Sequence, residues 1–153
     1  IRRIMPECSI SSDFIAGFCT EDENDQLETL ALMEYCKYDF RYMYFYSERP
    51  GTLAAKRYAD DVPEEVKKRR LQEIVDKQYY LSLYSNKRDV GNTYEVLIEG
   101  NSKKDESSWM GRTSHNKVIV FPKENYNLQK GDYVIVKVHD CTKGTLLGTI
   151  EKV

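Results

Sequence analysis

The hydrophobic period of this sequence changes at Gly91, and this change restricts the fold more than any other feature. Upstream of Gly91, apolar residues recur about every 3.6 positions between two strand-like runs, which is typical of amphipathic helices. Downstream, apolar and polar residues alternate, beginning with residues 94–99, as in strands with one buried face. The sequence therefore predicts an α/β part followed by an all-β part.

The α/β part begins with a strand, a helix and a second strand. Ser9–Phe18 reads as a strand whose last five residues are continuously apolar, which is typical of a parallel strand covered on both faces. Thr20, followed three residues later by Glu23, forms a capping-box pattern and predicts the start of a helix. The apolar face of that helix consists of Leu27, Leu30, Ala31 and Tyr35. The aromatic-rich run Tyr38–Tyr46 predicts the second strand, so we expect a βαβ unit of a parallel sheet.

A loop and a long helix follow this unit. Tyr46–Thr52 contains Pro and Gly, so the chain should leave the strand there, at the end that carries the active site in α/β barrels. Pro63 suits the first position of a helix, and the carboxylates beside it complement the helix dipole. Helical spacing continues to about Asn86, and we expect this helix to link two modules.

The all-β part contains five short alternating runs separated by turn residues. They are the run from residue 94, Trp109–Thr113, Lys117–Phe121, Tyr133–Val138 and Thr145–Ile150. Closing a small sheet on itself hides its edges, so these runs predict a small OB-like five-stranded β-barrel. Barrels of this kind commonly bind oligonucleotides.

The cysteines and histidines argue against a metal site. Cys8, Cys19, Cys36 and Cys141 lie too far apart in sequence for the close pairs of zinc ribbons and iron–sulfur sites, and three of them lie in patterns typical of buried, reduced thiols. The two histidines have no partner at helical metal-binding spacing, and no serine stands in the nucleophile pattern of α/β hydrolases. We therefore expect neither a metal centre nor a hydrolase.

The charge and hydropathy of the chain weigh against a strongly basic or membrane protein. The formal net charge is −2, but residues 86–153 carry a small positive excess, which weakly favours an anionic partner for that half. No apolar stretch approaches the roughly 20 residues that span a bilayer. The chain starts at Ile1 and enters strand-like sequence almost at once, so we expect a segment of a longer protein.

Four stretches resemble one family over essentially the whole chain. They are Asp13–Phe18 leading to Glu21, Tyr46–Thr52, Asp61–Gln72 and Gly111–Phe121. Together they are similar to the C-terminal part of the MiaB-type tRNA methylthiotransferases. The resemblance implies that residues 1–77 are the C-terminal portion of a radical S-adenosylmethionine (SAM) barrel with its linker helix. It implies that residues 78–153 are a TRAM domain, an OB-like RNA-binding module.

The resemblance also implies a reaction and its cofactors. These enzymes add a methylthio group to C2 of N6-isopentenyladenosine beside the tRNA anticodon, using SAM and two 4Fe-4S clusters. The cluster cysteines of the family have no counterpart among the four cysteines here, so we expect this chain to hold no metal, to carry no catalytic residue and to be inactive alone. The implied partner is the anticodon stem-loop of tRNA in the cytoplasm, with no membrane, and the expected state is a monomer.

The resemblance places the expected site residues. The SAM pocket would include Asp13, Gly17 and Glu21, although Cys19-Thr20 replaces the Pro-Gly that the family often has between the last two. The residues expected to contact substrate or tRNA are Tyr46, Arg49, Lys103, Lys104, Trp109, Arg112, Asn116 and Lys117. An arginine fork suits phosphate or carboxylate, an aromatic plane stacks a base, and positive groups neutralise phosphate.

Several of these residues have a plainer interpretation. Asp13 can cap a neighbour at the strand end, Gly17 can serve helix–strand packing, and Arg49 can pair with Glu48. Asn116 can hold a turn through its own side chain, and charges on a small barrel are often merely solvated. The alternative functions are a non-enzymatic OB-like module that binds RNA or protein, and a related methylthiotransferase acting on threonylcarbamoyl adenosine or on a ribosomal protein.

Overall fold

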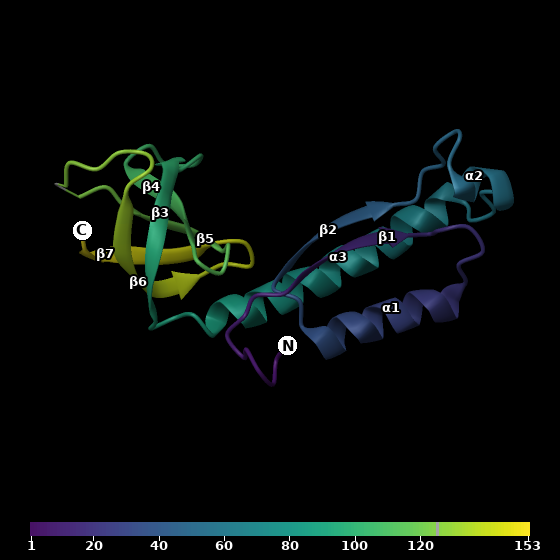
Figure 1. Cartoon of the computed structure of the whole chain (residues 1–153), viewed down its shortest axis with the longest axis horizontal. Helices are drawn as coiled ribbons and strands as arrows, with labels where there is room; N and C mark the ends of the chain where they lie inside the picture. The colour runs from purple at the N-terminus through teal and green to yellow at the C-terminus, as the bar shows by residue number, and fades with distance from the viewer. Residues whose placement is uncertain (125) are drawn as a thin grey trace. The chain divides into compact units, whose positions relative to one another are not determined.

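The computed structural model describes residues 1–124 and 126–153, which form two compact units (Figure 1). One unit consists of residues 10–81, and the other of residues 1–9 together with 82–153. The predicted long helix is α3 (Glu64–Lys87), within one residue of its expected ends, and it contributes residues to both units. The domain boundary that we expected after residue 77 stays a prediction.

The α/β unit contains the predicted strand–helix–strand pattern. Strand β1 (Ser11–Ala16), helix α1 (Glu23–Cys36) and strand β2 (Phe40–Phe45) follow one another, and the two strands pair in parallel with Ile15 opposite Tyr44. A short helix, α2 (Leu53–Arg57), follows the loop after β2. The expected βαβ unit is therefore confirmed.

Helices α1 and α3 cover one face of this two-stranded sheet. The buried core between them consists of Ala16, Met33, Ile74 and Leu81, with Phe14, Leu30, Met43 and Leu71 packed against it. On the opposite face, Ile15, Tyr42 and Tyr44 are each more than half exposed. Within the described residues, the expectation that β1 is covered on both faces is thus wrong. Continuous apolarity in the sequence does not say what covers the second face.

Helix α1 begins later than we predicted and buries a different face. Thr20 cannot be the N-cap because its backbone has a φ of +69°, whereas an N-cap residue is extended. Asp22 is the N-cap, and it forms the capping box with Asp25. Leu27 and Tyr35 of the expected apolar face are exposed. The buried face instead includes the polar Gln26, whose amide donates to the Arg70 carbonyl at 3.1 Å.

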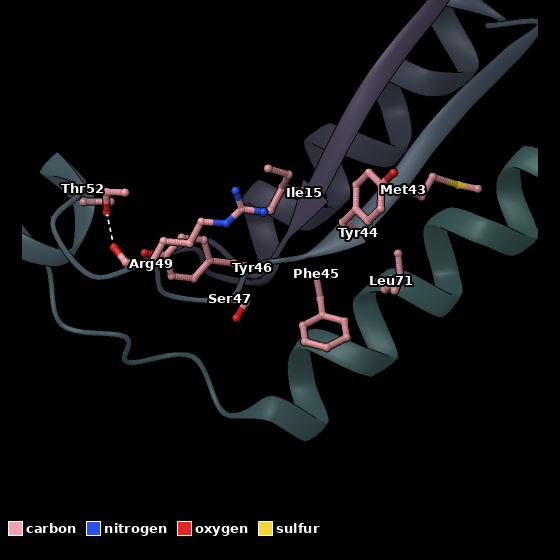
Figure 2. A pocket seen from close by; sticks show the side chains of 10 residues that line it. Ile15, Met43, Tyr44, Phe45, Tyr46, Ser47, Arg49, Thr52 and Leu71 are labelled. Atoms are coloured by element: carbon pink, nitrogen blue, oxygen red, sulfur yellow. Dashed lines mark hydrogen bonds between the residues drawn. The ribbon is translucent and has the colours of Figure 1, made fainter.

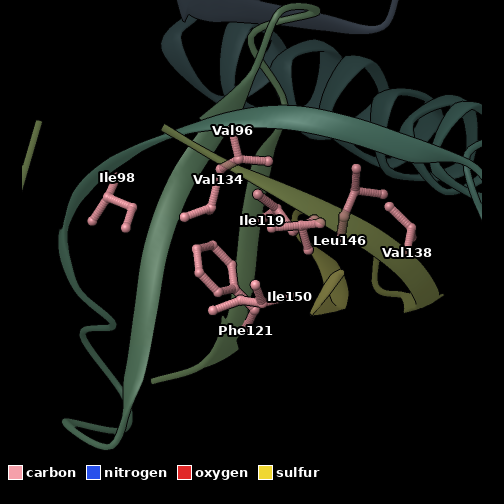
Figure 3. Packing of buried hydrophobic residues seen from close by; sticks show 9 residues of the cluster. Val96, Ile98, Ile119, Phe121, Val134, Val138, Leu146 and Ile150 are labelled. Carbon is pink, nitrogen blue, oxygen red and sulfur yellow. The ribbon is translucent and has the colours of Figure 1, made fainter. Parts of the chain in front are cut away.

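The second unit is the expected five-stranded barrel. Its strands are β3 (Thr93–Asn101), β4 (Ser108–Thr113), β5 (Val118–Pro122), β6 (Tyr133–Cys141) and β7 (Leu146–Lys152). They close in the order β3-β4-β5-β7-β6, and of the pairs described within this barrel only β5–β7 is parallel. Figure 3 shows the apolar side chains that fill the interior, among them Val96, Ile119 and Phe121.

The end of α3 is tied to this barrel by polar contacts. The Asn86 amide donates to the Thr142 carbonyl at 2.9 Å. The Lys117 ammonium donates to the Ser85 hydroxyl at 2.8 Å and pairs with the Asp89 carboxylate at 2.5 Å. The last turn of α3 is therefore part of the barrel unit. Over the described residues, none of the helices has the length and apolarity that crossing a membrane requires.

Candidate functional site

The carboxyl ends of β1 and β2 lie at the same edge of the sheet because the strands are parallel. The Tyr46 N–H donates to the Ala16 carbonyl at 2.8 Å, which extends the pairing just beyond the strands. Beside this edge lies a hollow of about 730 Å³, lined by residues of β1, β2, α3 and the segment around α2. Figure 2 shows Ile15, Tyr44, Tyr46 and Arg49 around it.

The hollow brings together some of the expected site residues and leaves others outside its lining. Tyr46 and Arg49 both line it. Asp13 is exposed and lies opposite Tyr42, on the same uncovered sheet face as Ile15, because side chains alternate along a strand. The lining itself is largely apolar and aromatic, with Arg49 as its one charged member among the described residues.

Tyr46 forms a fixed wall of the hollow. Its side chain is buried, and its ring packs against the Phe18 ring in a T-shaped arrangement with a centroid distance of 5.0 Å. The Lys67 ammonium lies 5.2 Å from the centre of the Tyr46 ring. The neighbouring Cys19 thiol, together with burial, raises the pKa of Tyr46 above its ordinary value.

Arg49 extends from a tightly turned loop. The Thr52 hydroxyl donates to the Arg49 carbonyl at 2.9 Å, and Gly51 between them takes a φ of +85°, which favours glycine. Thr52 is then the N-cap of α2. Figure 2 shows the Arg49 side chain reaching toward Ile15. Within the described part of the chain Arg49 makes no ion pair, so the alternative pairing with Glu48 is not formed.

Gly17 and Glu21 hold the loop after β1. The Glu21 carboxylate accepts hydrogen bonds from the Gly17 N–H at 2.9 and 3.0 Å and from the Phe18 N–H at 3.2 Å. It also pairs with Arg70 at 3.0 Å. A Cβ on Gly17 would stand 2.4 Å from Cγ of Lys67, so helix–strand packing alone requires glycine here. The expected contact of both residues with SAM stays a prediction.

Two buried cations on α3 were missed by the sequence analysis. Lys67 and Arg70 belong to a run of four basic residues, which reads as a solvated face, yet both side chains are about 95% buried. Arg70 donates to the Glu21 carbonyl at 2.9 Å and pairs with Glu23 at 3.0 Å. Arg70 and Arg69 hold the pKa of Glu23 below its ordinary value. The available signal was the spacing of positions 67, 70 and 74, which places both cations on the face of Ile74.

Some of the barrel residues expected to contact RNA are exposed, whereas others make intramolecular contacts. Lys103 and Lys104 are exposed in the β3–β4 loop. The Trp109 ring packs against the barrel core, and the Lys123 ammonium lies 4.6 Å from its centroid. A base that stacked on that side of the ring would have to displace Lys123.

Arg112, Asn116 and Lys117 make intramolecular contacts. Arg112 pairs with Glu99 at 3.1 Å and donates to the Asn116 side-chain oxygen at 2.9 Å. Asn116 lies in the β4–β5 turn with a φ of +59°, a conformation that asparagine adopts more readily than most residues. The Lys117 side chain is only 11% exposed in its pair with Asp89. The expected tRNA contacts of these three residues stay predictions, and they would compete with these bonds.

Comparison with known proteins agrees with the sequence resemblance. The TRAM domain family matches residues 87–150. The tRNA-2-methylthio-N(6)-dimethylallyladenosine synthase of Amoebophilus asiaticus is 62% identical over 151 residues, covering 98% of this chain and 31% of that protein. The protein of the same name from Christiangramia forsetii is 56% identical over 148 residues, covering 97% of this chain and 30% of the relative.

Among solved structures, the apo form of Mycoplasma genitalium RNase R is 12% identical with a TM-score of 0.37, covering 55% of this chain and 16% of that chain. A similarity this low says nothing about the function of this chain. The chain spans about a third of the length of the curated relatives it matches. It is therefore similar along nearly its whole length to part of the tRNA-2-methylthio-N(6)-dimethylallyladenosine synthases, and its residues 87–150 match the TRAM domain family.

Proposed function

We propose that this chain is the C-terminal part of a tRNA methylthiotransferase, which binds tRNA and lines part of the substrate pocket. The parent enzyme would add a methylthio group to C2 of N6-isopentenyladenosine next to the anticodon. The observation that carries this proposal is the identity of 62% and 56% with two synthases over 97–98% of the chain. A closed OB-like barrel matching the TRAM family supports it, since such barrels commonly bind oligonucleotides.

The two units would divide the work. The barrel unit would contact the anticodon stem-loop through exposed cations such as Lys103 and Lys104, which can neutralise phosphates without breaking an internal pair. The α/β unit would be the end of the radical SAM barrel. Its two parallel strands present an uncovered face with Ile15, Tyr42 and Tyr44, and further strands would complete the enclosure around that face.

The residues present fit SAM but not iron–sulfur clusters. Asp13 on the uncovered face offers a carboxylate to an amino group, and Arg49 offers a guanidinium to a carboxylate. SAM and the clusters together supply the methylthiolation chemistry when bound. No three His, Cys, Asp or Glu side chains of residues 1–124 and 126–153 gather as metal ligands. The clusters would therefore bind to parts of the parent protein outside this chain.

A chimera tests this function. In the full-length Christiangramia forsetii synthase, the segment that matches this chain is replaced by residues 1–153. The chimera is expressed in a bacterium that lacks its own methylthiotransferase but makes N6-isopentenyladenosine. Nucleosides from its tRNA are separated by chromatography and identified by mass spectrometry. We expect the 2-methylthio derivative of N6-isopentenyladenosine, as with the unaltered synthase.

The result that would contradict the proposal is a folded chimera with a full complement of iron that forms no methylthio nucleoside. Methylthiolation of threonylcarbamoyl adenosine in the same tRNA pool would instead identify the related class of enzyme. A chimera whose matching segment is deleted serves as the inactive control.

A further inference from the structure

Lys67, on α3, contacts three other parts of the α/β unit at the edge of the sheet beside the hollow. Its side chain is only 5% exposed, and its ammonium pairs with Asp60 in the segment before α3. The same ammonium lies 5.2 Å from the centre of the Tyr46 ring. Its Cγ occupies the space in front of Gly17, where a Cβ would approach within 2.4 Å. One side chain thus reaches the ends of β1 and β2 as well as the segment before α3.

Packing alone does not explain a lysine at this position. Burying an ammonium is costly unless it is paired, and a Met of similar length would fill the same space without that cost. The ammonium is compensated by the Asp60 carboxylate and by the negative face of the Tyr46 ring. The charge therefore fixes the relation between Asp60 and Tyr46, which an apolar side chain would leave free.

Because Tyr46 lines the hollow, the contact with Lys67 also affects the shape of the hollow. The Tyr46 ring contacts the Phe18 ring, at a centroid distance of 5.0 Å and an interplanar angle of 75°, and the Lys67 ammonium lies over it. Tyr46 lines the hollow and immediately precedes the loop that carries Arg49, another lining residue. The orientation of the Tyr46 ring therefore shapes one wall of the hollow.

We propose that Lys67 is a positioning residue that holds the Tyr46 ring as a wall for the purine base of the substrate. The proposal deepens the methylthiotransferase function and rests on it. Lys67 does not line the hollow itself, so it acts through Tyr46. An aromatic wall suits a flat base, because stacking on aromatic side chains is how proteins commonly hold unstacked RNA bases.

The kinetic test uses the active chimera and an anticodon stem-loop bearing N6-isopentenyladenosine. Lys67→Met retains a stem of similar length but removes the charge, whereas Lys67→Arg retains the charge. Lys68→Met is the matched control, because Lys68 is exposed on the same helix and pairs only with Glu64 in the described structure. We expect Lys67→Met to raise KM about fivefold while kcat changes less than twofold. Lys67→Arg should keep KM close to that of the unaltered chimera, and Lys68→Met should change neither KM nor kcat.

A double-mutant cycle tests whether Lys67 acts through Tyr46. Tyr46→Leu should raise KM by at least as much as Lys67→Met, and adding Lys67→Met to Tyr46→Leu should produce no further rise. Independent effects that multiply in the double variant would overturn the proposal. So would a KM for Lys67→Met that equals that of the unaltered chimera.

A spectroscopic test on residues 1–153 separates this proposal from the function on which it rests. The Tyr46 ring signals in a tyrosine-labelled NMR spectrum are those that Tyr46→Leu removes. Lys67→Met should shift or broaden them, Lys68→Met should leave them in place, and Lys67→Arg should keep them sharp. Unchanged Tyr46 signals in folded Lys67→Met would overturn the positioning role, whatever the chimera does. An inactive unaltered chimera would overturn the methylthiotransferase function alone.

Discussion

Lys117 illustrates how a charge that looks like a nucleic-acid contact can belong to the internal structure. It lies in the stretch Gly111–Phe121 that carries the family resemblance, and we expected it to contact tRNA. In the structure its ammonium bonds to Ser85 and pairs with Asp89, which also accepts a hydrogen bond from the Tyr94 hydroxyl at 2.8 Å. Both partners of the ion pair are nearly buried. Removing one charge would leave the other uncompensated.

Lys117→Met should therefore lower the free energy of unfolding of the barrel unit by about 2–3 kcal/mol, the cost of breaking a largely buried pair. Lys103→Met is the control, because Lys103 is exposed in the β3–β4 loop, and it should change stability by less than about 0.5 kcal/mol. Urea unfolding followed by Trp109 fluorescence measures both. Equal stability of the two variants would mean that the pair with Asp89 contributes little.

Tyr94 should make the barrel sensitive to alkaline pH. Burial, together with the hydrogen bond to Asp89, raises the pKa of Tyr94 to about 12, while the hydrogen bond from Asn92 lowers it in part. Because the folded-state pKa exceeds the ordinary value of 10.0, this stabilising contribution is complete below about pH 10 and is lost as the pH rises toward about 12. Tyr94→Phe removes the titrating group, so unfolding free energies at pH 9 and pH 11 should differ less in the variant than in the unaltered chain. The same difference in both would contradict this assignment.

The sequence indicated which residues lie close together at the strand ends better than it indicated their structural roles. Tyr46 and Arg49 line one hollow, as expected for neighbours in a loop at a strand end. The structural task of Glu21 was not predictable, because it depends on Arg70, 49 residues away in sequence. Helix–strand packing was one interpretation of Gly17, but the sequence did not show that Lys67 is the residue packed against it. A run of basic residues does not show which of its members face inward until the neighbouring helix is placed.

Among the helices and strands, the hydrophobic period predicted their types and order. Capping side chains and tertiary hydrogen bonds determine where they end. The five strands of the barrel and the long α3 follow from alternating and helical patterns that extend over many residues. The start of α1 does not, because Thr20-Glu23 and Asp22-Asp25 are both capping patterns. The choice between them is made by the Thr20 N–H, which donates to Asp61 at 2.7 Å and holds Thr20 outside the helix.

Two substitutions test which residue caps α1. Asp22→Ala should cost about 1 kcal/mol, because the Asn24 and Asp25 N–H groups lose their acceptor. Thr20→Gly should be neutral or stabilising, because glycine adopts the φ of +69° without strain. Hydrogen exchange in the first turn of α1 reports both changes locally. A larger loss in Thr20→Gly than in Asp22→Ala would restore Thr20 as the cap.

At the scale of the whole molecule, the two units differ in how completely their sheets are enclosed. The barrel strands each have two neighbours, whereas β1 and β2 form a two-stranded sheet with one face uncovered among the described residues. Unpaired edges and exposed backbone hydrogen bonds open at low free energy. The sequence predicted an α/β part followed by a β-barrel, but it carried no information on what covers the open face of the two-stranded sheet.

Hydrogen exchange of residues 1–153 should therefore be faster in β1 and β2 than in β3 and β6. In the full-length chimera, where the remainder of the synthase is present, exchange in β1 and β2 should slow while that of the barrel strands stays the same. Mass spectrometry of peptic peptides measures both proteins. Barrel and sheet peptides that exchange equally in the 153-residue chain would show that self-association already covers the open sheet.

If this chain binds tRNA through exposed cations, its affinity for an anticodon stem-loop must depend on salt. Fluorescence anisotropy of a labelled stem-loop bearing N6-isopentenyladenosine, measured with residues 1–153 from low to physiological salt, should give an affinity that falls with salt. The log–log slope should be about two to four, because a small positive excess neutralises few phosphates. Lys103→Ala with Lys104→Ala should lower the slope by about two, while Lys68→Ala should not. A folded chain that leaves the stem-loop unbound, or binds it equally at every salt concentration, would contradict the account.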